Sequence, residues 1–99
     1  MISSEILLKP IVKGKDVFIA DTARVLGQVT LGDNCSIWFG AVMRGDADTI
    51  SIGNGTNIQD NAVIHCDPGF PAIIGDNCIV GHSAIVHGAS VTNNVLVGM

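Results

Sequence analysis

Three histidines in the second half of the chain, His65, His82 and His87, have the chemistry to hold a transition-metal ion. Imidazole nitrogen is a common ligand of zinc, and a site with three protein ligands leaves a fourth position open for catalysis. A histidine in a repeat protein is, however, more often a solvated or hydrogen-bonded structural residue. The metal hypothesis therefore depends on whether the fold brings these three rings together.

Aliphatic residues recur at every sixth position over most of the sequence, and a small residue usually stands four positions after each one. Glycine, aspartate and asparagine, which tolerate the conformations of tight corners, follow many of these residues. The pattern predicts an all-β fold, a left-handed parallel β-helix of hexapeptide repeats, with three rungs in each coil of about 18 residues. The rungs are Ile19, Val25, Leu31, Ile37, Met43, Ile52, Ile58, Ile64, Ile74, Val80, Val86, Val91 and Val97. The small inward residues are Ala23, Val29, Cys35, Ala41, Thr56, Ala62, Cys78 and Ala84.

Two insertions interrupt this period, one of three residues around 45–47 and one of four residues within 66–71. With both allowed for, the similar segments LGDNCSI at 31–37 and IGDNCIV at 74–80 are two coils apart and fall on the same face. A repeat of stacked coils requires this agreement.

The same count predicts two columns of polar side chains. Arg44, His65 and His87 each follow a rung of one face in successive coils, so they should form an outward ladder with a spacing of about 4.8 Å. Asp60 and His82 fall in a second ladder at an adjacent corner. Two imidazoles at this spacing can share one metal ion, but His82 belongs to a different edge of the prism. A homotrimer with threefold symmetry, in which an adjoining subunit supplies His82, would complete three equivalent sites.

Four motifs placed on this repeat resemble those of the γ-class carbonic anhydrase family: RGD at 44–46, NIQD at 57–60, VIHCDPGFP at 63–71 and VGHSAIVHG at 80–88. The resemblance covers most of residues 17–99. It implies that His65, His82 and His87 bind zinc, or iron, at the interfaces of a trimer, two from one subunit and one from the next. It also implies an interface ion pair of Arg44 with Asp46 and a pocket lined by Asn57, Gln59 and Asp60.

The leading functional hypothesis is a metal-dependent lyase that reversibly hydrates carbon dioxide to bicarbonate. Hydroxide on the metal would attack CO₂. Gln59 would orient the nucleophile or the substrate, Asp60 would line the pocket, and Arg44 would hold the interface and bias the pocket towards bicarbonate. Active family members carry an acidic loop with a proton-transferring glutamate, and the corresponding stretch at 67–70 contains none.

Other interpretations stay open. Many hexapeptide-repeat proteins are acyltransferases that use acetyl-CoA, and a catalytically silent relative could keep the metal for trimer assembly alone. Arg44 with Asp46 or Asp60 could be only an interface salt bridge, and Asn57 and Asp60 could be only corner residues. The pair at 38–39, Trp-Phe, is expected to pack without contacting substrate, because nothing polar converges on it in the sequence.

Composition excludes several classes of function. The chain has 99 residues, a net charge of −4 and no tyrosine, which argues against a nucleic-acid partner. No apolar run approaches the length that crosses a bilayer, and the first residues do not resemble a secretory signal, so a cytoplasmic protein without a membrane partner is expected. The three cysteines are expected to be free thiols, with Cys66 beside the site.

Two segments are expected in the domain organisation. Residues 1–16 lack the rung pattern, with Lys13 at a rung position, and are expected to form a strand or loop that caps the first coil of the 17–99 β-helix. The sequence ends within a rung, at 97–99, and family members run on through further coils to a C-terminal helix. We therefore expect either a fragment or a second subunit that covers the last coil.

Overall fold

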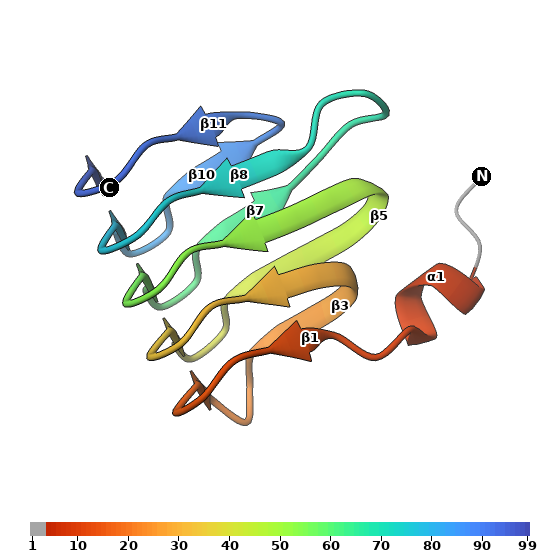
Figure 1. Ribbon diagram of the computed structural model, residues 1–99, viewed down its shortest axis with the longest axis horizontal. Helices are drawn as coiled ribbons and strands as arrows, with labels where there is room; N and C mark the ends of the chain where they lie inside the picture. The colour runs from red at the N-terminus through yellow and green to blue at the C-terminus, as the bar shows by residue number, and fades with distance from the viewer. Residues whose placement is uncertain (1–3) are drawn as a thin grey trace.

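The computed structural model describes residues 4–99 and is a parallel β-helix with one short helix at its N-terminal end (Figure 1). Successive coils stack so that each strand lies beside the equivalent strand of the next coil. The elements are α1 (Ser4–Leu8), β1 (Val12–Lys13), β2 (Phe18–Ile19), β3 (Arg24–Leu31), β4 (Ser36–Ile37), β5 (Val42–Ile52), β6 (Asn57–Ile58), β7 (Val63–His65), β8 (Ala72–Ile74), β9 (Ile79–Val80), β10 (Ile85–His87), β11 (Ser90–Val91) and β12 (Leu96–Val97).

The strands form two sheets with parallel pairing. The seven-stranded sheet runs β1-β3-β5-β7-β10 and also includes β8 and β11, while the five-stranded sheet runs β12-β9-β6-β4-β2. Strand β5 pairs with β7 through its first half and with β8 through its second half. The larger sheet therefore bends around a corner of the coil, and this bend is visible in β3 and β5 (Figure 1).

The core consists of the predicted rungs and small inward residues, which confirms the register. Ile37, Met43, Ile58, Ile64 and Val80 have no exposed surface. The small residues of the predicted inward slots are all buried as well, from Ala23 in the first coils to Ala84 in the last. Only the rungs nearest the two ends are half-buried: Ile19, Val25, Val91 and Val97. Alternate side chains thus fill the interior, as the period of a β-strand requires.

A ladder of side-chain hydrogen bonds stacks the Gly-Asp-Asn corners. The side-chain oxygen of Asn54 accepts a hydrogen bond from the backbone N–H of Asp33 (2.8 Å), and Asp76 accepts one from the N–H of Asn54 (2.8 Å). Asn93 accepts the next one, from Asp76 (2.8 Å). A Cβ at Gly53 would lie 2.3 Å from the Asp76 carboxylate, so this corner requires glycine. The turn chemistry of the repeat therefore also connects its coils.

The structure differs from the sequence prediction near the N-terminus. Residues 4–8 form a helix, not the strand or loop expected there, and β1 already pairs with β3, with Lys13 opposite Leu31. Strand pairing therefore begins inside the 1–16 segment. Residues 1–3 lie outside the described part. No helix within residues 4–99 has the length and apolar character needed to span a membrane.

Candidate metal centre

Arg44, His65 and His87 form the outward column that the sequence predicts. Arg44 pairs with His65 across β5 and β7, and His65 pairs with His87 across β7 and β10. The centroids of the two imidazole rings are 4.9 Å apart, with the ring planes inclined at 57°. Parallel strand pairing fixes this spacing, so the two rings are held side by side at the surface.

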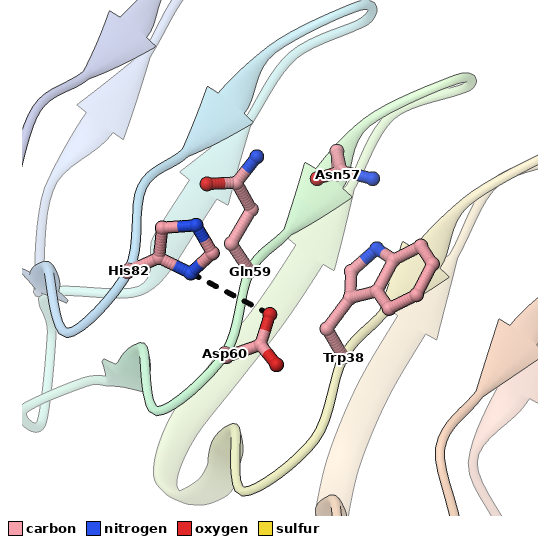
Figure 2. Close-up of a pocket in the computed structure, with 5 residues that line it drawn as sticks. All are labelled: Trp38, Asn57, Gln59, Asp60 and His82. Carbon is pink, nitrogen blue, oxygen red and sulfur yellow. Dashed lines mark ion pairs between the residues drawn. The ribbon is translucent and has the colours of Figure 1, made fainter.

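The second predicted column, Asp60 and His82, lies at the corner that follows the five-stranded sheet. Nδ1 of His82 is 3.5 Å from the Asp60 carboxylate, and both side chains are exposed (Figure 2). Within residues 4–99, no cluster of three histidine, cysteine, aspartate or glutamate side chains could hold a metal ion. One chain therefore brings His65 to His87 but does not bring His82 to either of them.

Asp46 supports the first column from inside the coil. One of its carboxylate oxygens lies 2.8 Å from Nε2 of His65 and accepts a hydrogen bond from the N–H of Ala47 (2.6 Å). The other oxygen is buried and lies 2.9 Å from Nε of Arg44, an ion pair without hydrogen-bond alignment. Burial opposes ionisation of this carboxyl, but the contacts with His65, Ala47 and Arg44 outweigh burial and lower the pKa of Asp46.

Asp67 contacts the other histidine of the column, a role that the sequence prediction missed. Its carboxylate lies 3.0 Å from Nε2 of His87. The second insertion folds back through a pair of hydrogen bonds between Asp67 and Phe70, which aims Asp67 at the next coil. The Asp-Pro-Gly sequence at 67–69, which follows Cys66, was the available signal, because these residues favour a tight turn.

A pocket of about 360 Å³ lies beside the second column and is lined by Trp38, Asn57, Gln59, Asp60 and His82 (Figure 2). The expectation that nothing polar converges on Trp38 was wrong, because four polar side chains of the next two coils share its pocket. Sequence distance hid this convergence, since strand stacking brings residues about 20 positions apart into one wall.

The pocket has one apolar wall, formed by Trp38, and two side-chain amides; within residues 4–99, that of Asn57 is hydrogen-bonded and that of Gln59 is not. The Trp38 ring is supported by Phe18, with ring centroids 5.0 Å apart. The side-chain amide of Asn57 donates to the hydroxyl of Ser36. Within the described residues, the Gln59 side chain makes no hydrogen bond and therefore remains available to a ligand.

Cys66 lies beneath the first column, and its thiol is buried. The sulfur accepts a hydrogen bond from the N–H of Asp48 (3.3 Å). Burial raises the pKa of the Cys66 thiol, with the nearby carboxylates of Asp46 and Asp48 adding to the effect. A protonated, inaccessible thiol is a poor nucleophile, so Cys66 serves packing. All three cysteines are free, as the sequence predicts.

The donor atoms of these residues suit a transition-metal ion. His65 and His87 present two neighbouring imidazoles, and each ring is contacted by a carboxylate, as is usual for histidine ligands. His82 is also partnered by a carboxylate and is 56% exposed, so it can reach a second molecule. The chemistry of these residues suits zinc or iron(II), and both ions accept imidazole ligands.

Comparison with known proteins identifies the repeat and close relatives. The family model for bacterial transferase hexapeptide (six repeats) matches residues 14–45, and that for the hexapeptide repeat of succinyl-transferase matches residues 71–99. A solved structure of a hexapeptide transferase family protein from Anaplasma phagocytophilum superposes with a TM-score of 0.82. It is 44% identical, and the match covers 87% of this chain and 50% of that one.

Curated relatives carry a more specific description. A "Probable carbonic anhydrase" from Methanocaldococcus jannaschii is 54% identical over 86% of this chain and 54% of its own length. "Gamma carbonic anhydrase 2, mitochondrial" from Arabidopsis thaliana is 50% identical over 86% of this chain and 33% of its own length. "Carbonic anhydrase" from Geobacillus kaustophilus is 49% identical over 83% of this chain and 45% of its own length. The chain thus spans about half or less of these relatives.

Proposed function

The chain belongs to the γ-class carbonic anhydrase-like family of hexapeptide-repeat proteins, and from this premise we propose that it hydrates carbon dioxide reversibly to bicarbonate at a metal site shared between subunits. The observation that carries the proposal is the pair of adjacent imidazoles, His65 and His87, on the outer face of one sheet. Carbonic anhydrase relatives imply a metal cofactor, and zinc is the ion proposed here, with iron(II) as the second choice.

His65 and His87 of one subunit and His82 of the next would hold the metal in a homotrimer. The bound metal would supply Lewis acidity, which activates water near neutral pH for attack on carbon dioxide. Asp46 and Asp67 would fix the orientations of the two rings that they contact, which is the usual role of carboxylates behind histidine ligands. Asp60 would do the same for His82.

Side chains of the pocket would bind and orient the substrate. The unengaged amide of Gln59 can donate to an oxygen of carbon dioxide or bicarbonate, while the Trp38 ring gives an apolar surface for the uncharged substrate. Asn57 is held by Ser36 and can offer its remaining amide hydrogen and oxygen. Arg44 adds positive charge that favours bicarbonate, and the ion pair with Asp46 keeps it in place.

An acyltransferase is the second candidate, because the matching repeat models and the solved neighbour are named for transferases. Two features of this chain favour the first candidate. Two histidines stand side by side where a single general base would suffice for acyl transfer, and relatives described as carbonic anhydrases are 46–54% identical. Acetyl-CoA turnover by metal-free protein would reverse this order.

A catalytically silent metal-binding trimer is the third candidate. It shares the metal site with the first and differs only in turnover. Stopped-flow measurement of carbon dioxide hydration with zinc-loaded protein separates the two. Full metal occupancy without hydration above the buffer rate would leave the assembly role standing and would refute the enzymatic one.

A subunit-mixing experiment tests the shared site directly. The variants His82→Ala and His87→Ala each lack a ligand in every site, so each alone should bind little zinc. After refolding of an equimolar mixture, about three-quarters of threefold rings contain both variants, and each mixed ring has one complete site of three. Zinc content should therefore recover to about a quarter of the wild-type value, with a matching fraction of any activity.

The result is decisive because recovery of zinc content depends on which subunit supplies each histidine ligand, and not only on the affinity of the site for zinc. Mixing His65→Ala with His87→Ala is the matched control: both ligands come from the same edge, so no mixed ring contains a complete site. Equal zinc content in the two mixtures, or undiminished zinc in His82→Ala alone, would contradict a site completed by a second subunit.

A further inference from the structure

Phe39 is an aromatic side chain that stays 48% exposed at the corner that also carries Asp60 and His82. The N–H of Asn61 donates to the carbonyl of Phe39, and the N–H of Ser83 donates to the carbonyl of Asp60 (both 3.0 Å). These contacts stack the corner coil by coil. We call Phe39, Asp60 and His82 the corner column, and Arg44, His65 and His87 the edge column.

Three of the four aromatic residues in the chain gather at the base of the corner column. The centroid of the Phe39 ring lies 6.3 Å from that of Trp38 and 6.5 Å from that of Phe18. The cluster packs on itself and still leaves two half-exposed phenylalanine rings on the surface. Aromatic residues, phenylalanine included, are enriched in protein interfaces, so this arrangement points to a covering partner.

The two columns have matching lengths. Both rise through the same three coils with a spacing of about 4.8 Å, because both follow parallel strand pairing. If His82 of one copy meets His65 and His87 of another, the level of every lower residue is fixed. Phe39 lies two coils below His82, and Arg44 lies two coils below His87, so Phe39 comes to the level of Arg44 when His82 comes to the level of His87.

The chemistry of the facing residues agrees with this register. The edge column carries Arg44 and two histidines, while the corner column offers an aromatic ring opposite the guanidinium and the Asp60 carboxylate one coil higher. The Arg44 side chain is 46% exposed, and its guanidinium nitrogens lie 2.9 Å from the Asp46 carboxylate and 3.2 Å from Nε2 of His65. A guanidinium that stacks on an aromatic face is attracted by the ring electrons.

From this register we infer that Phe39 stacks on Arg44 of a second copy of this chain and anchors the subunit contact below the metal site. The inference rests on the proposed function, because the shared metal sets the level of the two columns. The contact itself needs no metal. Phe39 of one copy binds Arg44 of the other, and this pairing brings the histidines of both copies to the same level.

The oligomeric state of Phe39→Ser in the presence of zinc tests the inference. By light scattering after size exclusion, the variant should need at least tenfold more protein than the wild type to assemble. Phe39→Tyr, which keeps the ring, should assemble as the wild type does. The matched control is Ile73→Ser, which removes an apolar side chain of similar exposure (44%) from strand β8; it should leave assembly unchanged.

A cross-linking experiment covers the case in which Phe39→Ser fails to fold. Chains carrying Phe39→Cys are mixed with chains carrying Arg44→Cys and oxidised; the three natural thiols are buried and should not react. A disulfide-linked dimer that contains one chain of each kind, and is absent when either variant is oxidised alone, supports the facing arrangement. Failure to form this dimer in a mixture that does assemble would refute it.

The two proposals fail in different ways. A zinc-loaded wild-type chain that remains monomeric at every concentration would remove the shared site and this contact together. A wild-type trimer whose assembly is unaffected by Phe39→Ser would remove only the contact. Since Trp38 is the single tryptophan and lies beside Phe39, its fluorescence should shift to shorter wavelength on assembly, and this shift should be lost in Phe39→Ser.

Discussion

The Asp67 carboxylate lies 3.0 Å from Nε2 of His87, although neither residue belongs to the other's coil. The contact exists because the insertion after His65 closes into a turn between Asp67 and Phe70 and extends beyond its own coil. Gly88, which follows His87, packs against this turn, since a Cβ there would lie 3.2 Å from Phe70. The short insertion therefore supports the upper histidine from outside, while Asp46 supports the lower one from inside.

We expect Asp67→Asn to weaken zinc binding by about tenfold, because the loss of a carboxylate behind a histidine ligand typically costs 10- to 100-fold in metal affinity. Competition with a chromophoric chelator at constant pH measures this change. Asp16→Asn, which changes the charge equally at an exposed position far along the chain, is the control. Equal affinities of the two variants for zinc would show that Asp67 has no role at the site.

Trp38 is expected to matter for substrate and not for metal. Trp38→Ala removes the apolar wall of the 360 Å³ pocket, so kcat/KM for carbon dioxide hydration should fall by about tenfold, or roughly 1.4 kcal/mol. Zinc content should be unchanged at protein concentrations at which the variant is assembled. Trp38→Phe, which keeps an aromatic surface, should retain most of the activity. A loss of zinc in Trp38→Ala that parallels the loss of activity would contradict a substrate-binding role.

The thiol of Cys35 gives a pH dependence with a definite sign. Burial raises the pKa of Cys35 above the ordinary thiol value of 9.0. The folded protein therefore holds this proton at a pH where the unfolded chain has lost it, so the free energy of unfolding should decline as pH rises through about 9. Urea unfolding between pH 8 and pH 10 measures this decline. Cys35→Ala should reduce this slope and leave the part that the raised pKa of Cys66 contributes, and an unchanged slope would show that other groups cause it.

The reactivity of the thiols tests independently whether the cysteine side chains are buried. All three cysteines are free and buried, so none should react with Ellman's reagent in the native protein and all three should react after unfolding. Rapid labelling of Cys66 in the folded state would show that the insertion after His65 opens.

The fold was predictable because its signal is periodic. Each coil repeats the same alternation of large and small inward residues, so a single error in register would have exposed residues such as Met43 and Ile64, which are fully buried. The stacking of His65 on His87 followed from the same count. The carboxylate partners of these two imidazoles could not be predicted in this way. Asp46 and Asp67 lie in the two insertions, where the six-residue period does not define the position of a side chain.

The pocket was also only partly predictable. Asn57, Gln59 and Asp60 share one motif and were expected together, but Trp38 joins them from the preceding coil. In the sequence Trp38 is next to Phe39 and far from Gln59. Trp38 and Gln59 become neighbours only because successive coils stack on one another. The helical start of the chain was missed for a different reason, since a five-residue helix is too short to show a period.

One small inward slot carries a hydrogen bond between successive coils. The Thr56 hydroxyl donates to the carbonyl of Gly75 (2.6 Å) and accepts from the N–H of Cys78 (3.1 Å). In the coils before and after, Cys35 donates through its thiol to the carbonyl of Gly53, and Cys78 donates to that of Thr92 (both 2.9 Å). The slot therefore selects a small donor and not simply a small residue.

This requirement predicts the response of Thr56, whose side chain is fully buried. Thr56→Val keeps the shape but leaves the Gly75 carbonyl and the Cys78 N–H without their partner, which should lower the free energy of unfolding by about 1–3 kcal/mol. Thr56→Cys restores a weak hydrogen-bond donor, the thiol that the chain itself uses in the adjacent coils. Its free energy of unfolding should therefore fall by less than that of Thr56→Val. Urea unfolding at one fixed protein concentration compares the three proteins, because assembly contributes to stability. If the valine variant were as stable as the wild type, the hydrogen bond would be dispensable and size alone would govern the slot.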